Sequence, residues 1–213
     1  MDRKEFLKKS AFALAASATA ATFSFTGLRK AHAAAGGNKT VAQKSGNLVA
    51  VMGGQPAEML RRTIKELGGI EQYVKPGDKV VVKPNIGWAK TPELAANTNP
   101  EAVGAMVKLC FDAGAKEVVV FDHTCNEWRK CYEMSGIEKA AKANGAKVLP
   151  GNDESYYRDV EIPQGKTLKK AKIHKALLDC DVWFNMPVLK NHGGARMTLS
   201  MKNYMGIVWD RQI

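Results

Sequence analysis

Three apolar segments of the chain are each followed by ionisable and amide side chains. In chain order these side chains are Lys83 and Asn85, then Asp122 and His123, then Lys190, Asn191 and His192. A lysine ammonium can hold a carboxylate or a phosphate as a point charge. A neutral imidazole can bind a metal ion or exchange protons near pH 7. These residue types therefore predict a site for an anionic ligand, with proton transfer or metal binding as further chemistry.

The candidate site residues fall into three groups according to the role that their side chains suit. The candidate catalytic residues are His192, His123 and Lys190, the candidate ligand-binding residues are Lys83, Asn85, Asn97, Asn99, Lys202 and Asn203, and the candidate metal ligands are Asp122, His123 and His192. Each group has a structural alternative. A lysine at a strand edge can extend its ammonium into solvent, an asparagine ahead of Pro100 can cap a helix, and a histidine can simply be hydrogen-bonded.

The sequence lacks the motifs of several enzyme classes. It contains no nucleophile elbow, no phosphate-binding GK[ST] loop, no dinucleotide fingerprint and no zinc-protease motif. The four cysteines, Cys110, Cys125, Cys131 and Cys180, form no CxxC pair, which argues against a zinc ribbon or an iron–sulfur motif within this chain. The cofactor is therefore unknown, and a metal ion or an iron–sulfur cluster stays open. Cys125 and Cys131 could pair in an oxidising compartment or stay free.

Apolar runs alternate with segments of helical periodicity along the chain. We expect strands at residues 47–53, 79–85, 117–123, 146–151 and 181–189, helices at residues 56–69, 100–115, 127–144 and 171–180, and a β-hairpin arm at residues 156–168. Strands that are apolar on both faces and separated by helices indicate a parallel sheet covered on both sides. The predicted fold class is α/β, a Rossmann-like, mainly parallel sheet with helices on both faces and a small β-hairpin arm.

This fold would bring the polar side chains together, because ligands of open α/β sheets bind beyond the carboxyl ends of the strands. The segment between Asn85 and Pro100 is also longer than a plain connection requires. We therefore expect it to lie over the site and to position groups there.

The first 33 residues have the pattern of an export signal. A basic head is followed by an alanine-rich apolar run and by Ala31-His32-Ala33, which suits a signal peptidase. The head resembles a twin-arginine signal with Arg3-Lys4 in place of the arginine pair, whereas the alternative is an amphipathic first helix. We expect an exported protein in the periplasm or cell envelope, with a signal at residues 1–33, a linker at residues 34–46, an α/β domain at residues 47–213, and no stable membrane span after signal removal.

The charge balance favours anionic partners. The 213 residues carry a net charge of +11, and residues 1–33 contain six basic and two acidic residues, so their removal leaves +7. A moderately basic protein attracts anionic small molecules, anionic surfaces or nucleic acid. The densest basic run, residues 166–175, reads as a solvated face, and no basic stripe is interleaved with aromatic residues. We therefore expect an anionic small molecule as partner rather than nucleic acid.

Four segments together resemble the domain-of-unknown-function 362 family. They are VVVKPNIGW, ANTNPEAV, DAGAKEVVVFDH and PVLKNHGGARMTLSMKNYMGIV. The resemblance runs from about residue 49 to the last residue. It implies a bacterial or archaeal α/β protein, frequently exported and associated with iron–sulfur proteins, whose activity is not established. The family's recurring polar positions would fall on Lys83, Asn85, Asn97, Asn99, Lys190, His192, Lys202 and Asn203. Similar proteins continue further, so the domain is expected to be incomplete at its C-terminus.

Three functions stay open from the sequence. The first is an exported protein with an anionic-ligand or cofactor site at the strand ends, which could act as an enzyme. The second is a non-catalytic binding or accessory partner of an exported iron–sulfur or other redox protein. The third is a scaffold without a ligand, which would have little use for so many converging polar strand ends.

Overall fold

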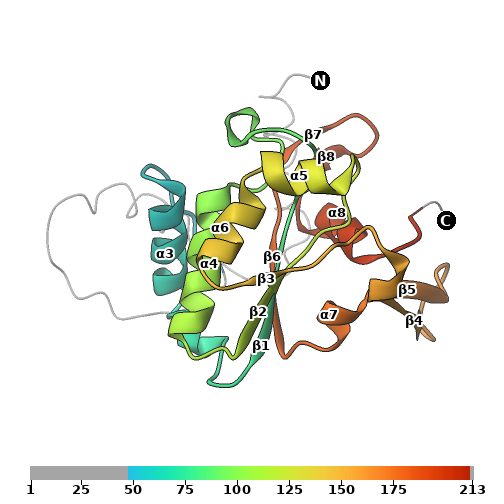
Figure 1. Ribbon diagram of the computed structural model, residues 1–213, viewed down its shortest axis with the longest axis horizontal. Helices are drawn as coiled ribbons and strands as arrows, with labels where there is room; N and C mark the ends of the chain where they lie inside the picture. Colours follow the sequence, from blue (N-terminus) through green and yellow to red (C-terminus); the bar gives the residue numbers. More distant parts are fainter. Residues whose placement is uncertain (1–47, 212–213) are drawn as a thin grey trace, which may run out of the picture. The chain divides into compact units, whose positions relative to one another are not determined.

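The computed structural model describes residues 48–211, so the predicted signal (1–33) and linker (34–46) lie outside the described residues. Helices and strands alternate through most of this part of the chain (Figure 1). Among the described residues, no helix has both the length and the hydropathy needed to cross a membrane.

The centre of the fold is a four-stranded parallel sheet in the order β3-β2-β1-β6. Its strands are β1 (Lys79–Pro84), β2 (Glu117–Val120), β3 (Lys147–Val148) and β6 (Val182–Met186). Val82 of β1 lies opposite Val120 of β2 and Phe184 of β6. All strands are parallel, so their carboxyl ends meet at one edge of the sheet.

Helices cover one face of this sheet. They are α3 (Pro56–Glu66), α4 (Pro100–Asp112) and α6 (Ile137–Ala143), while α5 (Trp128–Met134) lies nearer the carboxyl ends of the strands (Figure 1). Val80 and Val82 of β1 pack in this core with Val103 and Val107 of α4, and all four are almost fully buried. β1 reads as an unbroken valine run because both of its faces are covered.

The other face carries a smaller cluster. Val81, Val119 and Phe121 are buried there against Leu177 of the short helix α7 (Lys175–Leu178) and against Ile207. The predicted Rossmann-like α/β fold with both sheet faces covered is confirmed.

Two hairpins and several short helical turns complete the described chain. The first hairpin pairs β4 (Tyr157–Glu161) with β5 (Lys170–His174), and the second pairs β7 (Lys190–His192) with β8 (Arg196–Thr198). The remaining elements are η1 (Ile70–Gln72), η2 (Pro92–Leu94), η3 (Glu154–Tyr156), α8 (Ser200–Asn203) and η4 (Tyr204–Ile207). A hairpin arm is therefore present near the predicted residues 156–168, but its second strand lies beyond them at Lys170–His174, and the second hairpin was not predicted.

The strands predicted at residues 117–123 and 146–151 are shorter in the structure, where they form β2 and β3. Three further predicted elements differ more strongly. Residues 48–53 form no strand, because they pair with none of the four strands of the sheet, and Leu48 is 87% exposed. The helix predicted at residues 171–180 is reduced to α7, because Lys170–His174 pairs with β4 as a strand. The predicted fifth strand ends early at Met186, and Lys190 begins the separate strand β7.

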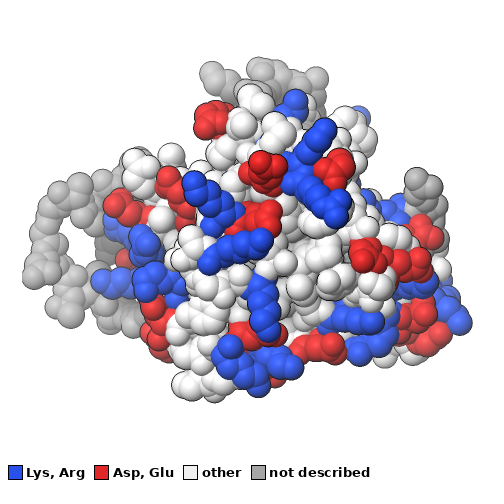
Figure 2. Space-filling view, viewed as in Figure 1, with Lys and Arg blue, Asp and Glu red and all other residues white. Residues whose placement is uncertain are grey.

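The basic run at residues 166–175 lies largely on the first hairpin. Lys170 pairs with Glu161 at 3.1 Å, and Lys172 pairs with Glu154. Figure 2 accordingly shows acidic and basic side chains side by side at this end of the molecule. The lysines of this hairpin face solvent and neighbouring carboxylates, as the reading of the run as a solvated face requires.

Candidate functional site

A buried ion pair joins the ends of two neighbouring strands. Lys83, the fifth residue of β1, donates from Nζ to Asp122 Oδ1 at 2.6 Å, and both side chains are almost fully buried. The same ammonium donates to Pro84 O at 2.7 Å and to Asn203 Oδ1 at 3.2 Å. Burial lowers the pKa of Lys83, and the Asp122 carboxylate opposes this shift. The positive charge of Lys83 is thus balanced by the Asp122 carboxylate inside the protein.

Further hydrogen bonds fix Asp122 in place. Its second carboxylate oxygen accepts the Ile86 N–H at 2.6 Å. Its backbone N–H donates to Tyr132 Oη at 2.8 Å, while the Tyr132 hydroxyl lies 2.9 Å from Asp122 O and 3.0 Å from Leu149 O. Burial raises the pKa of Tyr132, so this hydroxyl keeps its proton and serves as a structural donor.

The segment that closes over the ion pair contains α8 and η4. Asn203 donates from Nδ2 to Asn185 Oδ1 at 2.7 Å, which ties α8 to β6. A Cβ atom at Gly206 would lie 1.8 Å from Asp122 Oδ1 and 2.8 Å from Lys83 Nζ. Only glycine therefore allows the backbone to approach the pair this closely.

The long segment after β1 is held by its own polar side chains. Asn97 accepts the Trp88 N–H at 3.1 Å and donates to Trp88 O at 2.8 Å. Thr98 accepts the Asn85 N–H at 2.8 Å and donates to Met186 O at 2.6 Å, which joins the segment to β6. Asn99 caps α4 by accepting the Glu101 N–H at 2.9 Å. Asn97 and Asn99 therefore brace backbone, and neither lines the cavity described next.

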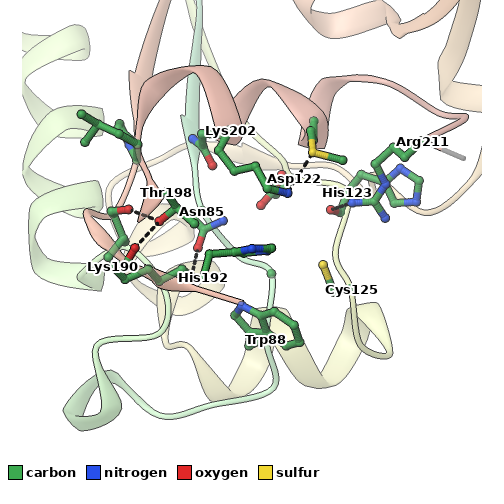
Figure 3. A pocket seen from close by; sticks show the side chains of 17 residues that line it. Asn85, Trp88, Asp122, His123, Cys125, Lys190, His192, Thr198, Lys202 and Arg211 are labelled. Carbon is green, nitrogen blue, oxygen red and sulfur yellow. Dashed lines mark hydrogen bonds between the residues drawn. The ribbon is translucent and has the colours of Figure 1, made fainter. Parts of the chain in front are cut away.

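A cavity of about 270 Å³ lies beside the ion pair at the carboxyl edge of the sheet (Figure 3). It is lined by seven of the predicted residues: Asn85, Asp122, His123, Lys190, His192, Lys202 and Asn203. These residues come from several segments of the chain, and the first and last of them, Asn85 and Asn203, are more than 100 residues apart in sequence. The predicted convergence of polar strand ends therefore takes place, with Lys83 behind the cavity wall.

The cavity carries three cationic side chains. Lys190 donates from Nζ to Asn85 Oδ1 at 2.7 Å and to Ala96 O, and burial lowers its pKa. Lys202 Nζ contacts Met205 Sδ at 2.9 Å. Arg211 donates to His123 O at 3.2 Å and to Thr124 O at 3.0 Å. Within residues 48–211, none of these three cations forms an ion pair with a carboxylate.

The two predicted histidines have different surroundings. His123 Nδ1 lies 3.1 Å from Val208 O, its ring stacks on Trp209 at 5.3 Å, and burial lowers its pKa. His192 of β7 accepts the Ala195 N–H at Nδ1 at 3.0 Å, which places its proton on Nε2 in the neutral form. His123 is thus tied to the C-terminal segment, whereas the ring of His192 lies in the pocket (Figure 3).

The predicted metal ligands Asp122, His123 and His192 line the same cavity, but they do not form a metal-binding group. No group of three His, Cys, Asp or Glu side chains in the described part of the chain could hold a metal ion. Both carboxylate oxygens of Asp122 already accept hydrogen bonds, and His123 Nδ1 faces Val208 O. Cys125 and Cys131 are free, and the buried Cys131 thiol donates to Gly87 O at 3.8 Å, so the alternative of a disulfide is not realised.

Comparison with known proteins shows the family. A family described as a domain of unknown function, DUF362, matches residues 80–213. The chain belongs to this family. The thylakoid-associated protein sll1697 of Synechocystis sp. is 30% identical to the chain over 149 residues, which are 70% of this chain and 45% of that protein. The DUF362 chain therefore spans less than half the length of this relative.

Ten of the residues that line the cavity were not predicted from the sequence of this DUF362 protein. Trp88, Cys125, Thr198 and Arg211 are among them. Trp88 stands three residues after Asn85, in the same segment that the polar strand-end pattern singled out, so its position was available as a signal. Arg211 follows no strand and reaches the site only because the C-terminal segment folds back over His123.

Proposed function

We propose that this DUF362 protein is exported and binds an anionic ligand in the cavity at the carboxyl edge of its sheet. The observation that carries the proposal is the set of three cations, Lys190, Lys202 and Arg211, that line one cavity without a paired carboxylate among residues 48–211. Lys83 and Asp122 neutralise each other, so the cavity keeps an excess of positive charge.

Electrostatics favours an anion at this place. Lys190 is partly buried, so its charge is less screened than that of a surface lysine. An anionic group about 4 Å from one ammonium gains roughly 4 kcal/mol at an effective dielectric constant of about 20, before desolvation is subtracted. Asn85, hydrogen-bonded to Lys190, would orient the ammonium toward the ligand.

His192 is the residue that suits proton transfer in this cavity. Asp122 and His123 are engaged in the fold, whereas His192 keeps Nε2 for a ligand. An enzyme would use His192 beside Lys190 as acid or base. A ligand that the protein converts should no longer be converted by His192→Gln, with binding retained. A binding or accessory partner of a redox protein would hold the ligand unchanged in both proteins.

The first test is binding, because it needs no knowledge of a substrate. Isothermal titration of the full 213-residue chain with inorganic phosphate at low ionic strength should show binding at one site. Lys190→Gln should weaken phosphate binding about tenfold, because a hydrogen bond to a charged group contributes about 1.5–3 kcal/mol. The matched control is Lys65→Gln in the last turn of α3, which makes the same charge change away from the cavity.

Two results would contradict the anion site. The first is no phosphate binding at low ionic strength. The second is equal loss of affinity in Lys190→Gln and Lys65→Gln, which would reflect net charge rather than a site.

Export is proposed from residues 1–33 and needs its own test. The full chain, produced in a bacterium with its own N-terminus, should be recovered outside the cytoplasm, and a chain that lacks residues 1–33 should remain inside. The name of the thylakoid-associated relative is in keeping with a protein that works at or beyond a membrane. Equal retention of both chains inside the cell would refute export.

A further inference from the structure

The backbone of Trp88 is fixed by hydrogen bonds from a buried side chain. Asn97, whose side chain is almost fully buried, accepts its N–H at 3.1 Å and donates to its C=O at 2.8 Å. Both backbone polar groups of one residue are thus bound by one side-chain amide. The Trp88 side chain nevertheless stays 37% exposed and lines the cavity.

The neighbours of Trp88 are anchored from a second direction. Gly87 O accepts the Cys125 N–H at 2.9 Å, and the Ala89 N–H donates to Asn126 Oδ1 at 3.2 Å. The loops after β1 and β2 therefore clamp residues 87–89 from both sides. The backbone that presents the indole is ordered before any ligand arrives, so a ligand that contacts the ring pays little further ordering entropy.

Apolar side chains continue around the cavity. Pro187, Val188, Leu199 and Met205 line it together with Trp88, and the Leu199 side chain is 44% exposed. Figure 3 shows the side chains of Trp88 and His192 in the pocket, and Arg211 donates to His123 O. A small inorganic anion would contact the cations and leave these apolar groups in water. A ligand with a flat apolar body would cover them as well.

We propose that the ligand is an aromatic anion, whose ring system packs on the Trp88 indole while its anionic group is held by Lys190 and Lys202. This inference rests on the proposed anion site and specifies its ligand class. Offset packing of two aromatic rings and burial of apolar area both favour such a ligand over a bare anion. The cavity of about 270 Å³ lies just below the range typical of drug-sized ligands, so a body of one or two rings fits.

The test compares three matched probes on the full 213-residue chain by isothermal titration. The probes are 2-naphthoate, which has a ring and a charge, acetate, which has the charge alone, and 2-naphthol, which has the ring alone. We expect 2-naphthoate to bind at least about tenfold more tightly than either of the others. We also expect inorganic phosphate to compete with it, because both use Lys190.

Two tryptophan variants locate the effect. Trp88→Leu should reduce the advantage of 2-naphthoate over acetate to about threefold or less, and should leave phosphate affinity unchanged. Trp183→Leu is the matched control, because Trp183 on β6 is 39% exposed and does not line the cavity. It should keep the full advantage. Lys190→Gln should weaken both 2-naphthoate and phosphate.

The outcomes separate the two proposals. Equal affinity for 2-naphthoate and acetate, with phosphate still bound, would overturn the aromatic ligand class and leave the anion site standing. An unchanged 2-naphthoate advantage in Trp88→Leu would also overturn it. Failure of every anion to bind would overturn both proposals. The comparison of probes on the unaltered chain decides the ligand class even if Trp88→Leu does not fold.

Discussion

Lys83 and Lys190 both follow apolar segments, and both were predicted to bind an anion, yet the structure treats them differently. Lys83 is fully buried and donates to the Asp122 carboxylate. Lys190 is half-buried and donates only to the neutral oxygens of Asn85 and Ala96 among the described residues. One charge is satisfied by the fold, and the other remains for a ligand.

The difference shows how one residue type can serve structure or binding. A buried cation requires an opposite charge, because desolvation otherwise penalises the ionised form by several kcal/mol. A cation at a cavity wall keeps part of its hydration and tolerates neutral partners. Four predictions test this contrast between polar groups that are buried and paired within the fold and those that line the cavity. They run from the largest expected effect to the smallest.

Removal of the Lys83 ammonium should have the largest effect. Lys83→Met leaves the Asp122 carboxylate buried and uncompensated, so we expect the free energy of unfolding to fall by about 3–5 kcal/mol, measured by urea denaturation. Lys83→Met combined with Asp122→Asn should recover part of this loss, because the amide oxygen still accepts the Ile86 N–H. A loss below about 1 kcal/mol for Lys83→Met, as at an exposed ion pair, would show that the buried pair does not stabilise the fold more than a surface pair does.

The buried residue His174 should make the stability of the fold depend on pH. It is fully buried and stacks on Phe121, its Nδ1 accepts the Ala176 N–H at 3.2 Å, and burial lowers its pKa from 6.5 to about 4. The unfolded chain therefore binds the proton more readily than the folded protein. The stabilisation is complete above pH 6.5 and is lost as the pH falls toward 4, by about 3 kcal/mol in all.

The variant for this test keeps the helix cap and removes the titration. His174→Asn can still accept the Ala176 N–H through its side-chain oxygen. Urea denaturation between pH 7 and pH 4 should show a smaller loss of stability for His174→Asn than for the unaltered protein. Parallel pH profiles for the two proteins would show that His174 contributes nothing to the acid sensitivity.

Lys190→Gln should separate binding from stability. We expect its affinity for inorganic phosphate to fall by about 1.5 kcal/mol, while its free energy of unfolding changes by less than about 1 kcal/mol, because no buried carboxylate is left unpaired. Titration and urea denaturation of the same preparation measure both quantities. A loss of stability as large as that of Lys83→Met would show that Lys190 stabilises the fold in the same way as Lys83.

Asn99→Ala should have the smallest effect. It removes the side chain that caps α4, so we expect a loss of about 1 kcal/mol in stability with phosphate affinity unchanged. Asn99→Ser retains a capping oxygen and should recover most of the loss. A clear loss of phosphate affinity in Asn99→Ala, with Asn99→Ser equally affected, would return Asn99 to the ligand-binding set.

Much of the architecture could be predicted because it depends on local patterns. The valine run of β1 and the start of α4 at Pro100 were read correctly. The strand prediction was wrong for residues 48–53, because apolar periodicity does not show whether a segment finds a strand to pair with. Residues 170–174 misled the helix prediction, because pairing with β4 is a tertiary contact.

The sequence by itself determined the parallel α/β sheet and the gathering of polar residues at one of its edges. Both follow from hydrophobic patterning and from the rule that parallel strands end on the same side. Only the tertiary structure decided that Lys83 pairs with Asp122, 39 residues away, that Asn97 braces Trp88, and that Arg211 returns to the cavity. These contacts depend on strand register and on loop paths, so residue type and spacing alone do not specify them.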